Sequence, residues 1–206
     1  MKPASQLAEK GSMPVRALHL VLAVPLALAA TAGSADSSAN RGRDDRVAAG
    51  LSGYNEVHFI PGPPAALRGA ISSSARGAFK ATIDKDTNVV SYELRYSGLE
   101  GDVTQAHIHF GQNHTVGGIV VWLCQTAAAP APASVAASTP TCPQQGTVTG
   151  TIGPAQLLAQ DAQGIAADEF GELLRAIRSG ATYANVHSSL FPPGEIRGQI
   201  RDSHNH

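Results

Sequence analysis

The sequence predicts a mainly β fold, an antiparallel Greek-key-like β-sandwich of about eight strands with one or two short helices inserted before the last pair of strands. From residue 53 onward, apolar residues recur with a period of two, as in strands with one buried face. The 206 residues include 21 Gly and 13 Pro, which suits many short elements joined by turns. Only 15% of the residues are charged, which argues against disorder driven by excess charge.

The predicted strands are separated by segments rich in Gly, Pro, Asp and Asn. Residues 84–88, 97–102 and 191–194 are of this kind, and their side chains favour tight turns. The strands are predicted over residues 53–60, 76–83, 89–96, 104–110, 118–124, 146–152, 182–187 and 195–201.

A helical period occurs once, in the segment that follows Asp168. Phe170, Leu173, Leu174 and Ile177 lie at helical spacing, so they predict an amphipathic helix. Asp168 is suited to cap its beginning and Gly180 to end it. A shorter helical turn is predicted from Pro154 to Leu158, because proline is favourable at the first helical position.

Residues 1–35 have the order of a secretory signal peptide. Three basic residues precede an apolar run over residues 17–30, and small residues follow it. The run contains Pro25 and is shorter than the roughly 20 residues that span a bilayer. We therefore expect export to the periplasm or the exterior, and no membrane span after cleavage.

After the signal peptide, residues 36–50 lack apolar periodicity and predict a disordered linker. The folded domain is expected over residues 51–202, with a flexible tail at 203–206. Removing residues 1–35 takes away three of 15 basic and one of 16 acidic residues, so the formal charge changes from −1 to −3. Such a chain lacks the cationic clusters that bind nucleic acid.

The two cysteines, Cys124 and Cys142, lie in the expected folded domain. Two cysteines in an oxidising compartment most simply form one disulfide. Between them, residues 127–140 form a low-complexity Ala/Pro loop that is not expected to contribute to a core. A metal site built on the two thiolates is the alternative, but they lack the close spacing of a zinc-binding pair.

Three histidines are candidate metal ligands. His107 and His109 alternate on one predicted strand, so their side chains lie on the same face, opposite Ile108. His187 shares a face of another strand with Asn185, and three imidazoles would meet if the two strands were close. Imidazole favours copper or zinc. The alternative is a hydrogen-bonded histidine network without metal, because no carboxylate or thiolate ligand is indicated by spacing.

The last predicted strand places Glu195, Arg197, Gln199 and Arg201 on one face. One interpretation is a solvated polar face on which Glu195 and Arg197 add little stability. The other makes Arg197 an anion-steering or structural cation near the histidines. Spacing alone does not decide between them.

Seven ordered motifs resemble the CHRD domain, the module named from chordin. Individually they are weak, but their order and spacing are specific. They include the segment that ends in Glu56, the His107–His109 pair, the segment from Tyr183 through Asn185 to His187, and the segment with Glu195 and Arg197. They cover residues 51–56, 77–79, 97–99, 106–109, 117–120, 183–187 and 194–200. The family often continues with Val-Pro-Pro after the glutamate, whereas Val57 is followed here by His58 and Phe59.

The resemblance implies a secreted or cell-surface protein; many bacterial members are single exported domains. Within chordin, the module belongs to an antagonist that binds bone morphogenetic proteins. We therefore expect a non-enzymatic binding or structural module whose partner is an unidentified protein or cell-envelope component. The sequence indicates no catalytic residue, and copper or zinc is its one candidate cofactor.

Two other functions compete with a binding or structural module. The alternative to a binding module is a copper- or zinc-binding protein, which would be redox-active if the metal were copper. This alternative arises because His-x-His on a sandwich strand is similar to the copper ligands of copper-zinc superoxide dismutase. The chain lacks a convincing bridging histidine and the zinc ligands that should follow it. A hydrolase based on Ser188 and Ser189 lacks the Gly-x-Ser-x-Gly elbow.

Overall fold

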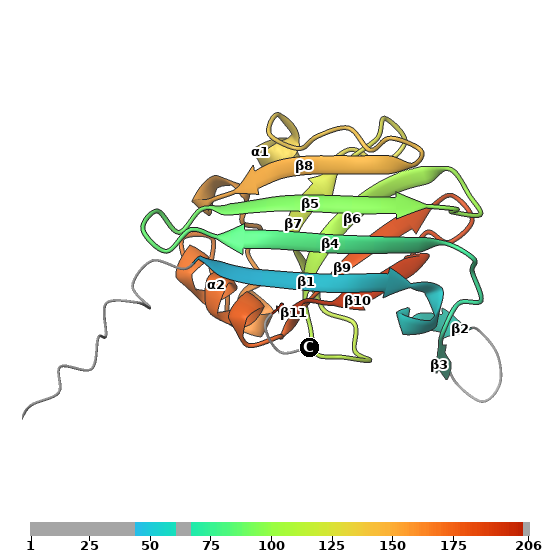
Figure 1. The fold of residues 1–206 in the computed structure, drawn as a ribbon, viewed down its shortest axis with the longest axis horizontal. Coiled ribbons are helices and arrows are strands. Elements are labelled where there is room, and N and C mark those ends of the chain that lie inside the picture. Colours follow the sequence, from blue (N-terminus) through green and yellow to red (C-terminus); the bar gives the residue numbers. More distant parts are fainter. Residues whose placement is uncertain (1–43, 61–66, 204–206) are drawn as a thin grey trace, which may run out of the picture. The chain divides into compact units, whose positions relative to one another are not determined.

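The computed structural model describes residues 44–60 and 67–203, and the expected signal peptide lies outside these ranges. The described part is mainly β, as predicted, with strands arranged in two facing layers (Figure 1). The first layer contains β1 (Asp45–Ser52), β4 (Arg76–Ile83), β5 (Val90–Ser97) and β8 (Gly146–Ile152). The second contains β6 (Val103–Phe110), β7 (Gly118–Cys124), β9 (Thr182–Ser188) and β10 (Ile196–Gln199).

The two layers are parts of one antiparallel sheet, with the strand order β7-β6-β9-β10-β1-β4-β5-β8. The sheet turns from one layer to the other where β1 meets β10, and Ser52 is the partner of Arg197 there. At the opposite side β7 and β8 approach each other, so the sandwich is nearly closed into a barrel. A separate hairpin joins β2 (His58–Ile60) to β3 (Leu67–Gly69).

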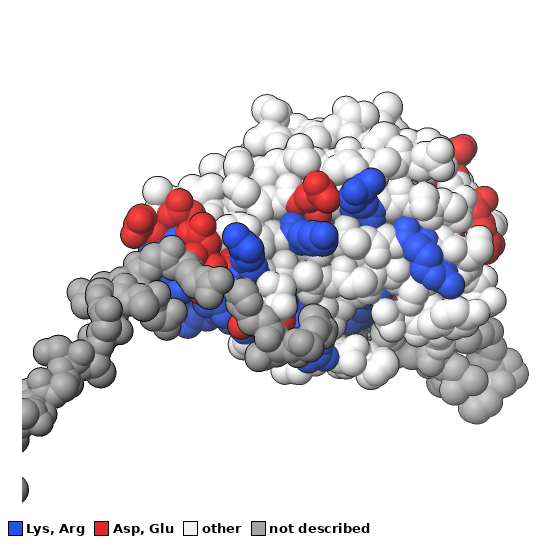
Figure 2. All heavy atoms as spheres, viewed as in Figure 1, with Lys and Arg blue, Asp and Glu red and all other residues white. Residues whose placement is uncertain are grey.

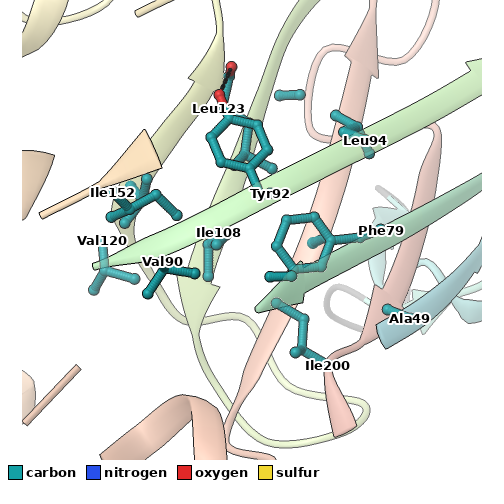
Figure 3. Close-up of a cluster of buried hydrophobic side chains, with 14 of the residues drawn as sticks. Ala49, Phe79, Val90, Tyr92, Leu94, Ile108, Val120, Leu123, Ile152 and Ile200 are labelled. Carbon is teal, nitrogen blue, oxygen red and sulfur yellow. Dashed lines mark hydrogen bonds between the residues drawn. The ribbon is translucent and has the colours of Figure 1, made fainter. Parts of the chain in front are cut away.

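Apolar side chains from both layers fill the space between them (Figure 3). Phe79 and Tyr92 stack from the first layer, with ring centroids 6.2 Å apart, and face Ile108 and Leu123 of the second. The buried Tyr92 hydroxyl donates to the Leu123 carbonyl at 2.7 Å. This bond ties the layers together at their open side and satisfies a polar group that would be costly to bury alone.

The first strand lies earlier than predicted. Residues 45–50, expected in the linker, belong to β1, whereas the strand expected over 53–60 is replaced by a 3₁₀ turn, η2 (Gly53–Asn55), and the short β2. Alternation is present in β1, since Val47 and Leu51 are buried, but alanine and glycine between them give it little contrast. Pairing with β4 along its whole length stabilises the strand.

The end of the chain also differs in detail. The strand expected over 195–201 is divided into β10 and β11 (Arg201–Asp202), and β11 pairs with β1. Ser203, expected in the flexible tail, donates its backbone N–H to the Arg46 carbonyl at 2.9 Å. Residues 204–206 lie outside the described part.

The helix predicted after Asp168 is present as α2 (Phe170–Arg178), and its four apolar residues are buried at one end of the two layers. Its N-cap is Glu169 rather than Asp168, without a side-chain capping bond. The turn predicted at Pro154 is η3 (Pro154–Gln156), and a further turn, η4 (Asp161–Gln163), follows.

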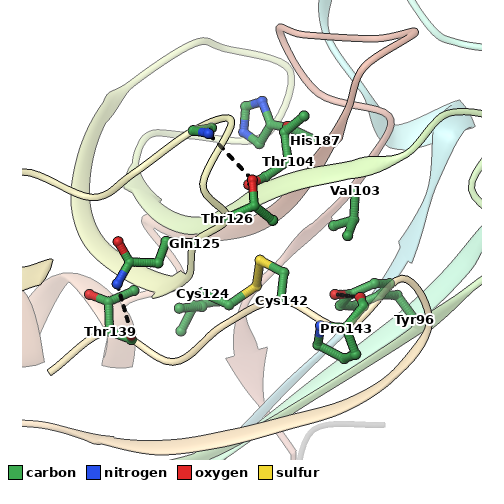
Figure 4. The surroundings of a disulfide bond; sticks show 12 residues. Tyr96, Val103, Thr104, Cys124, Gln125, Thr126, Thr139, Cys142, Pro143 and His187 are labelled. Atoms are coloured by element: carbon green, nitrogen blue, oxygen red, sulfur yellow. Dashed lines mark hydrogen bonds between the residues drawn. A yellow bond between two sulfur atoms is a disulfide. The ribbon is translucent and has the colours of Figure 1, made fainter. Parts of the chain in front are cut away.

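Cys124 and Cys142 form a disulfide, as predicted (Figure 4). The expectation that the intervening loop adds nothing to a core is wrong. The loop contains the short helix α1 (Ala133–Ala136), whose Val135 is buried. Gln125 also anchors the loop, because its side-chain amide donates to the carbonyls of Ala136 and Thr139.

Replacing both cysteines by serine is expected to lower the free energy of unfolding by about 3 kcal/mol, because the bridge closes a loop with a sequence separation of 18 residues. Urea denaturation of the oxidised protein and the double variant would measure this loss. The same double variant should respond no further to a reducing agent, whereas the parent protein should. A loss below about 0.5 kcal/mol would mean that the Gln125 contacts alone hold the loop.

The outer face of the first layer carries Lys and Arg side chains, with acidic side chains beside some of them, among uncharged residues (Figure 2). Arg46 and Lys80 line a shallow hollow over β1, β4 and β5, and Arg76 and Arg95 line a second one. Among the helices of the described residues, none is long and apolar enough to cross a membrane.

Candidate metal centre

The three histidines singled out by the sequence meet on the outer face of the second layer. His107 and His109 come from β6, and His187 comes from the neighbouring strand β9. One potential ligand nitrogen from each lies within 4.8 Å of the others. The pairing of β6 with β7 shifts register immediately before each histidine of β6, between Ala106 and His107 and between Ile108 and His109. Such irregularities redirect side chains locally, here beside the metal-ligand candidates.

Backbone carbonyls orient two of the imidazoles. His109 Nδ1 lies 3.0 Å from the Gly117 carbonyl oxygen, and His187 Nδ1 lies 2.8 Å from that of Pro192. A carbonyl only accepts, so in each neutral ring Nδ1 carries the proton and Nε2 has the free lone pair. This arrangement is the one by which outer groups orient metal-binding histidines.

The third imidazole joins the other two directly. His107 Nδ1 lies 3.2 Å from His187 Nε2, and because that nitrogen is an acceptor, His107 donates the proton. His107 Nε2 and His109 Nε2 are buried without a hydrogen-bond partner. Buried polar atoms are normally satisfied, so two unpartnered lone pairs in one cluster call for an explanation.

The cluster is removed from solvent. His107, His109 and His187 are 0%, 8% and 5% exposed. Burial lowers the pKa of His109 and of His187 to about 4, although the carbonyl bonds act in the opposite direction. Burial, followed by the proximity of His187 and His109, lowers the pKa of His107 well below its usual value. At neutral pH all three rings are therefore neutral, the form that binds metal.

Two aromatic side chains complete the surroundings of the histidines. The Trp122 ring lies 4.3 Å from the His107 ring, centroid to centroid, and nearly perpendicular to it. Tyr183 stacks on His109 at 4.7 Å with an interplanar angle of 4°. Both rings restrict the imidazoles to one orientation. Sequence reasoning did not select either residue, although Tyr183 follows the same alternation as Asn185 and His187.

The interpretation of the last strand as a solvated polar face is wrong. Arg197 is 2% exposed, and its guanidinium carbon lies 3.3 Å from the centre of the Tyr183 ring. The guanidinium also donates to the carbonyls of Thr115 and Gln112, at 2.6 and 3.1 Å. Arg197 is thus a buried structural cation that holds the loop between β6 and β7 over the sheet. Tyr183 belongs to β9, which lies between β10, the strand of Arg197, and β6, the strand of His109.

Glu56 supplies a buried carboxylate on the same face. Its Oε2 accepts a hydrogen bond from Asn185 Nδ2 at 2.5 Å, and Oε1 accepts from the Val57 N–H at 2.9 Å. Burial raises the pKa of Glu56, while these hydrogen bonds and the charge of Arg197 oppose the rise. Asn185 is the partner of His107 on one side and Arg197 on the other, so it links the carboxylate to both.

A glycine permits this contact. A Cβ at residue 194 would lie 2.5 Å from Glu56 Oε2 and 2.6 Å from Asn185 Nδ2, and Gly194 has a φ of +136°. Both the close approach and the backbone angle favour glycine. The next residue, Glu195, is fully buried, and its Oε1 accepts from Ser73 Oγ and the Glu100 N–H.

The remaining candidates have other roles. His114 is exposed, and His58 contacts Phe191 edge to face at 6.5 Å. The Ser188 hydroxyl accepts from the Phe191 N–H, and the Ser189 hydroxyl accepts from the Asp102 N–H. These serines therefore stabilise the turns around β9, and the hydrolase arrangement gains no support from them.

Comparison with known proteins identifies the family of the chain through one match to a family model. No curated protein and no solved structure matches the chain. The family description "CHRD domain" matches residues 47–200, which begin in β1 and end just after β10. The matched span contains both layers, the disulfide, the three histidines and the buried group of Glu56, Asn185 and Arg197. The chain therefore belongs to the CHRD domain family.

Proposed function

We propose that this chain is an exported, non-enzymatic CHRD-domain protein that binds one transition-metal ion through His107, His109 and His187. The observation that carries the proposal is the convergence of three neutral imidazoles whose candidate ligand nitrogens lie within 4.8 Å of one another. Three histidines are a known protein ligand set for zinc, and imidazole also suits copper.

A histidine network that serves stability alone explains the geometry less well. Such a network would satisfy the ring nitrogens, whereas His109 Nε2, which holds the free lone pair of its ring, is buried without a partner. His107 can present Nδ1 to an ion once its proton moves to Nε2, which brings two nitrogens 3.2 Å apart into one coordination sphere. Two ligands at roughly 2.0–2.1 Å from one ion can have such a separation.

The metal proposal predicts that tag-free, chelator-treated protein takes up one equivalent of copper or zinc. At a free metal concentration of about 100 times Kd, binding should stabilise the fold by about 2.7 kcal/mol, which is measurable as a rise in Tm. His109→Gln should abolish uptake, while His114→Asn, which changes an exposed histidine, should leave it unchanged. Protein that takes up neither metal and shows no rise in Tm would contradict the proposal.

The export proposal rests on residues 1–35 and on the disulfide, which persists in oxidising compartments. Expression of the full chain in a bacterial host is expected to give a processed protein whose N-terminus lies near residue 36 in the periplasm or medium. Intact-mass measurement checks this. Unprocessed protein that remains in the cytoplasm with free thiols would contradict it.

A further inference from the structure

We propose that the histidine site selects a monovalent ion, Cu(I), over divalent ions such as Zn(II); this inference rests on the proposed metal-binding function. Three features of the site favour a monovalent ion: the charge of the ligand set, the burial of the site and the fixed charges around it.

The ligand set carries no charge. The three candidate ligands are imidazoles, which bind metal in their neutral form, and the described residues place no carboxylate or thiolate in the cluster. A metal ion therefore brings its full charge into the site. Zn(II) sites usually contain a fourth ligand, either a side chain or water.

Burial makes that charge expensive. The ligands are 0–8% exposed, and the cost of transferring an ion from water into such surroundings rises with the square of its charge. A divalent ion consequently has about four times the desolvation cost of a monovalent ion of similar size. Three neutral ligands compensate a single charge more readily than a double one.

The surrounding charges do not offset the difference. Arg197 lies against Tyr183, which stacks on His109, so only the Tyr183 ring separates its positive charge from the histidine cluster. Glu56, which accepts a hydrogen bond from Asn185, is an opposite charge that acts on Arg197. The pair leaves little net negative potential for a dication, so Arg197 acts as a positioning residue that disfavours higher charge.

The test compares two probes on the chelator-treated, full-length mature protein. Cu(I) is titrated without oxygen, with ascorbate and bicinchoninate as competitor, and Zn(II) with a chromophoric zinc chelator. We expect Cu(I) to bind one equivalent at least 100-fold more tightly than Zn(II). Trp122 is the only tryptophan of the chain and contacts His107, so its fluorescence should change on binding. Ag(I), a monovalent ion that does not cycle between oxidation states, should displace Cu(I).

The outcomes separate the two proposals. Zn(II) that binds as tightly as Cu(I), with both lost in His109→Gln, would overturn the selectivity and leave metal binding intact. Protein that binds neither ion would overturn both. Because this comparison uses the unaltered protein, it does not depend on how well any variant folds.

A matched pair of variants tests Arg197. Arg197→Gln should reduce the ratio of Cu(I) to Zn(II) affinity at least tenfold, because the buried positive charge is removed. Arg201→Gln removes an exposed charge from the neighbouring strand β11 and should leave the ratio unchanged. A folded Arg197→Gln protein with the original ratio would show that Arg197 has no part in selectivity.

Discussion

Arg197→Met is expected to lower the free energy of unfolding by about 3–5 kcal/mol, the loss typical when one member of a buried charged group is removed. Arg197 is 2% exposed, and its guanidinium stacks on Tyr183 and donates to two loop carbonyls. Methionine fills a similar volume but leaves the Thr115 and Gln112 carbonyls without their donor. It also leaves the buried Glu56 without its compensating charge.

Urea denaturation monitored by Trp122 fluorescence measures the loss. Arg201→Met is the control, and because Arg201 is exposed, it should change stability by no more than about 0.5 kcal/mol. Glu56→Gln combined with Arg197→Met should cost less than the sum of the two single changes, since no charge remains unpaired. Additive effects would show that Glu56 and Arg197 do not interact.

The metal-free protein is expected to lose stability steeply as the pH falls from about 6.5 to about 4. Ordinary histidines have a pKa near 6.5, whereas burial lowers the pKa of His109 and His187 to about 4 and that of His107 well below 6.5. In this window the unfolded chain binds protons that the native protein excludes. Each such proton lowers stability by about 1.4 kcal/mol per pH unit, so three give up to about 4 kcal/mol per unit.

The carboxyl groups with shifted pKa values either oppose this loss of stability or contribute at a lower pH. The raised pKa of Glu56 has the opposite sign, because the native protein then takes up a proton more readily as the pH falls. Asp45 and Asp84, whose pKa values are lowered, act below their ordinary value of 3.8. Denaturation of chelator-treated protein between pH 7 and pH 4 gives the slope. His109→Gln should reduce this slope by about 1.4 kcal/mol per pH unit, the contribution of one proton. An unchanged slope would show that His109 does not contribute to the loss of stability.

Much of the fold was predictable because the strands alternate clearly. Leu94 and Tyr92 in β5, or Ile108 in β6, stand between polar neighbours, and the sheet buries them as the pattern requires. β1 was missed because Ala48 and Gly50, two of its outward positions, give no polar contrast with the buried residues beside them. Its position depends on pairing with β4 and β10, which are distant in sequence, and local patterns contain no such information.

The candidate site was predictable in its ligands but not in its surroundings. The spacing of His107 and His109 and the motif around His187 identified the imidazoles. The outer face of the second layer appeared solvated, because polar side chains such as Arg197 normally face water. The loop between β6 and β7 covers that face, and only the folded structure shows that the polar residues are buried there.

The pairing of β11 with β1 also makes the domain suitable for circular permutation. Val47 is the partner of Asp202, so the first and last strands of the described domain run antiparallel and their outer ends lie side by side. A short linker from residue 203 to residue 44 would span this distance, and new termini could be opened in the exposed turn around residue 86. Such a circular permutant should retain the fold. Pulling on the original two ends would load the β1–β11 hydrogen bonds one after another, like a zipper.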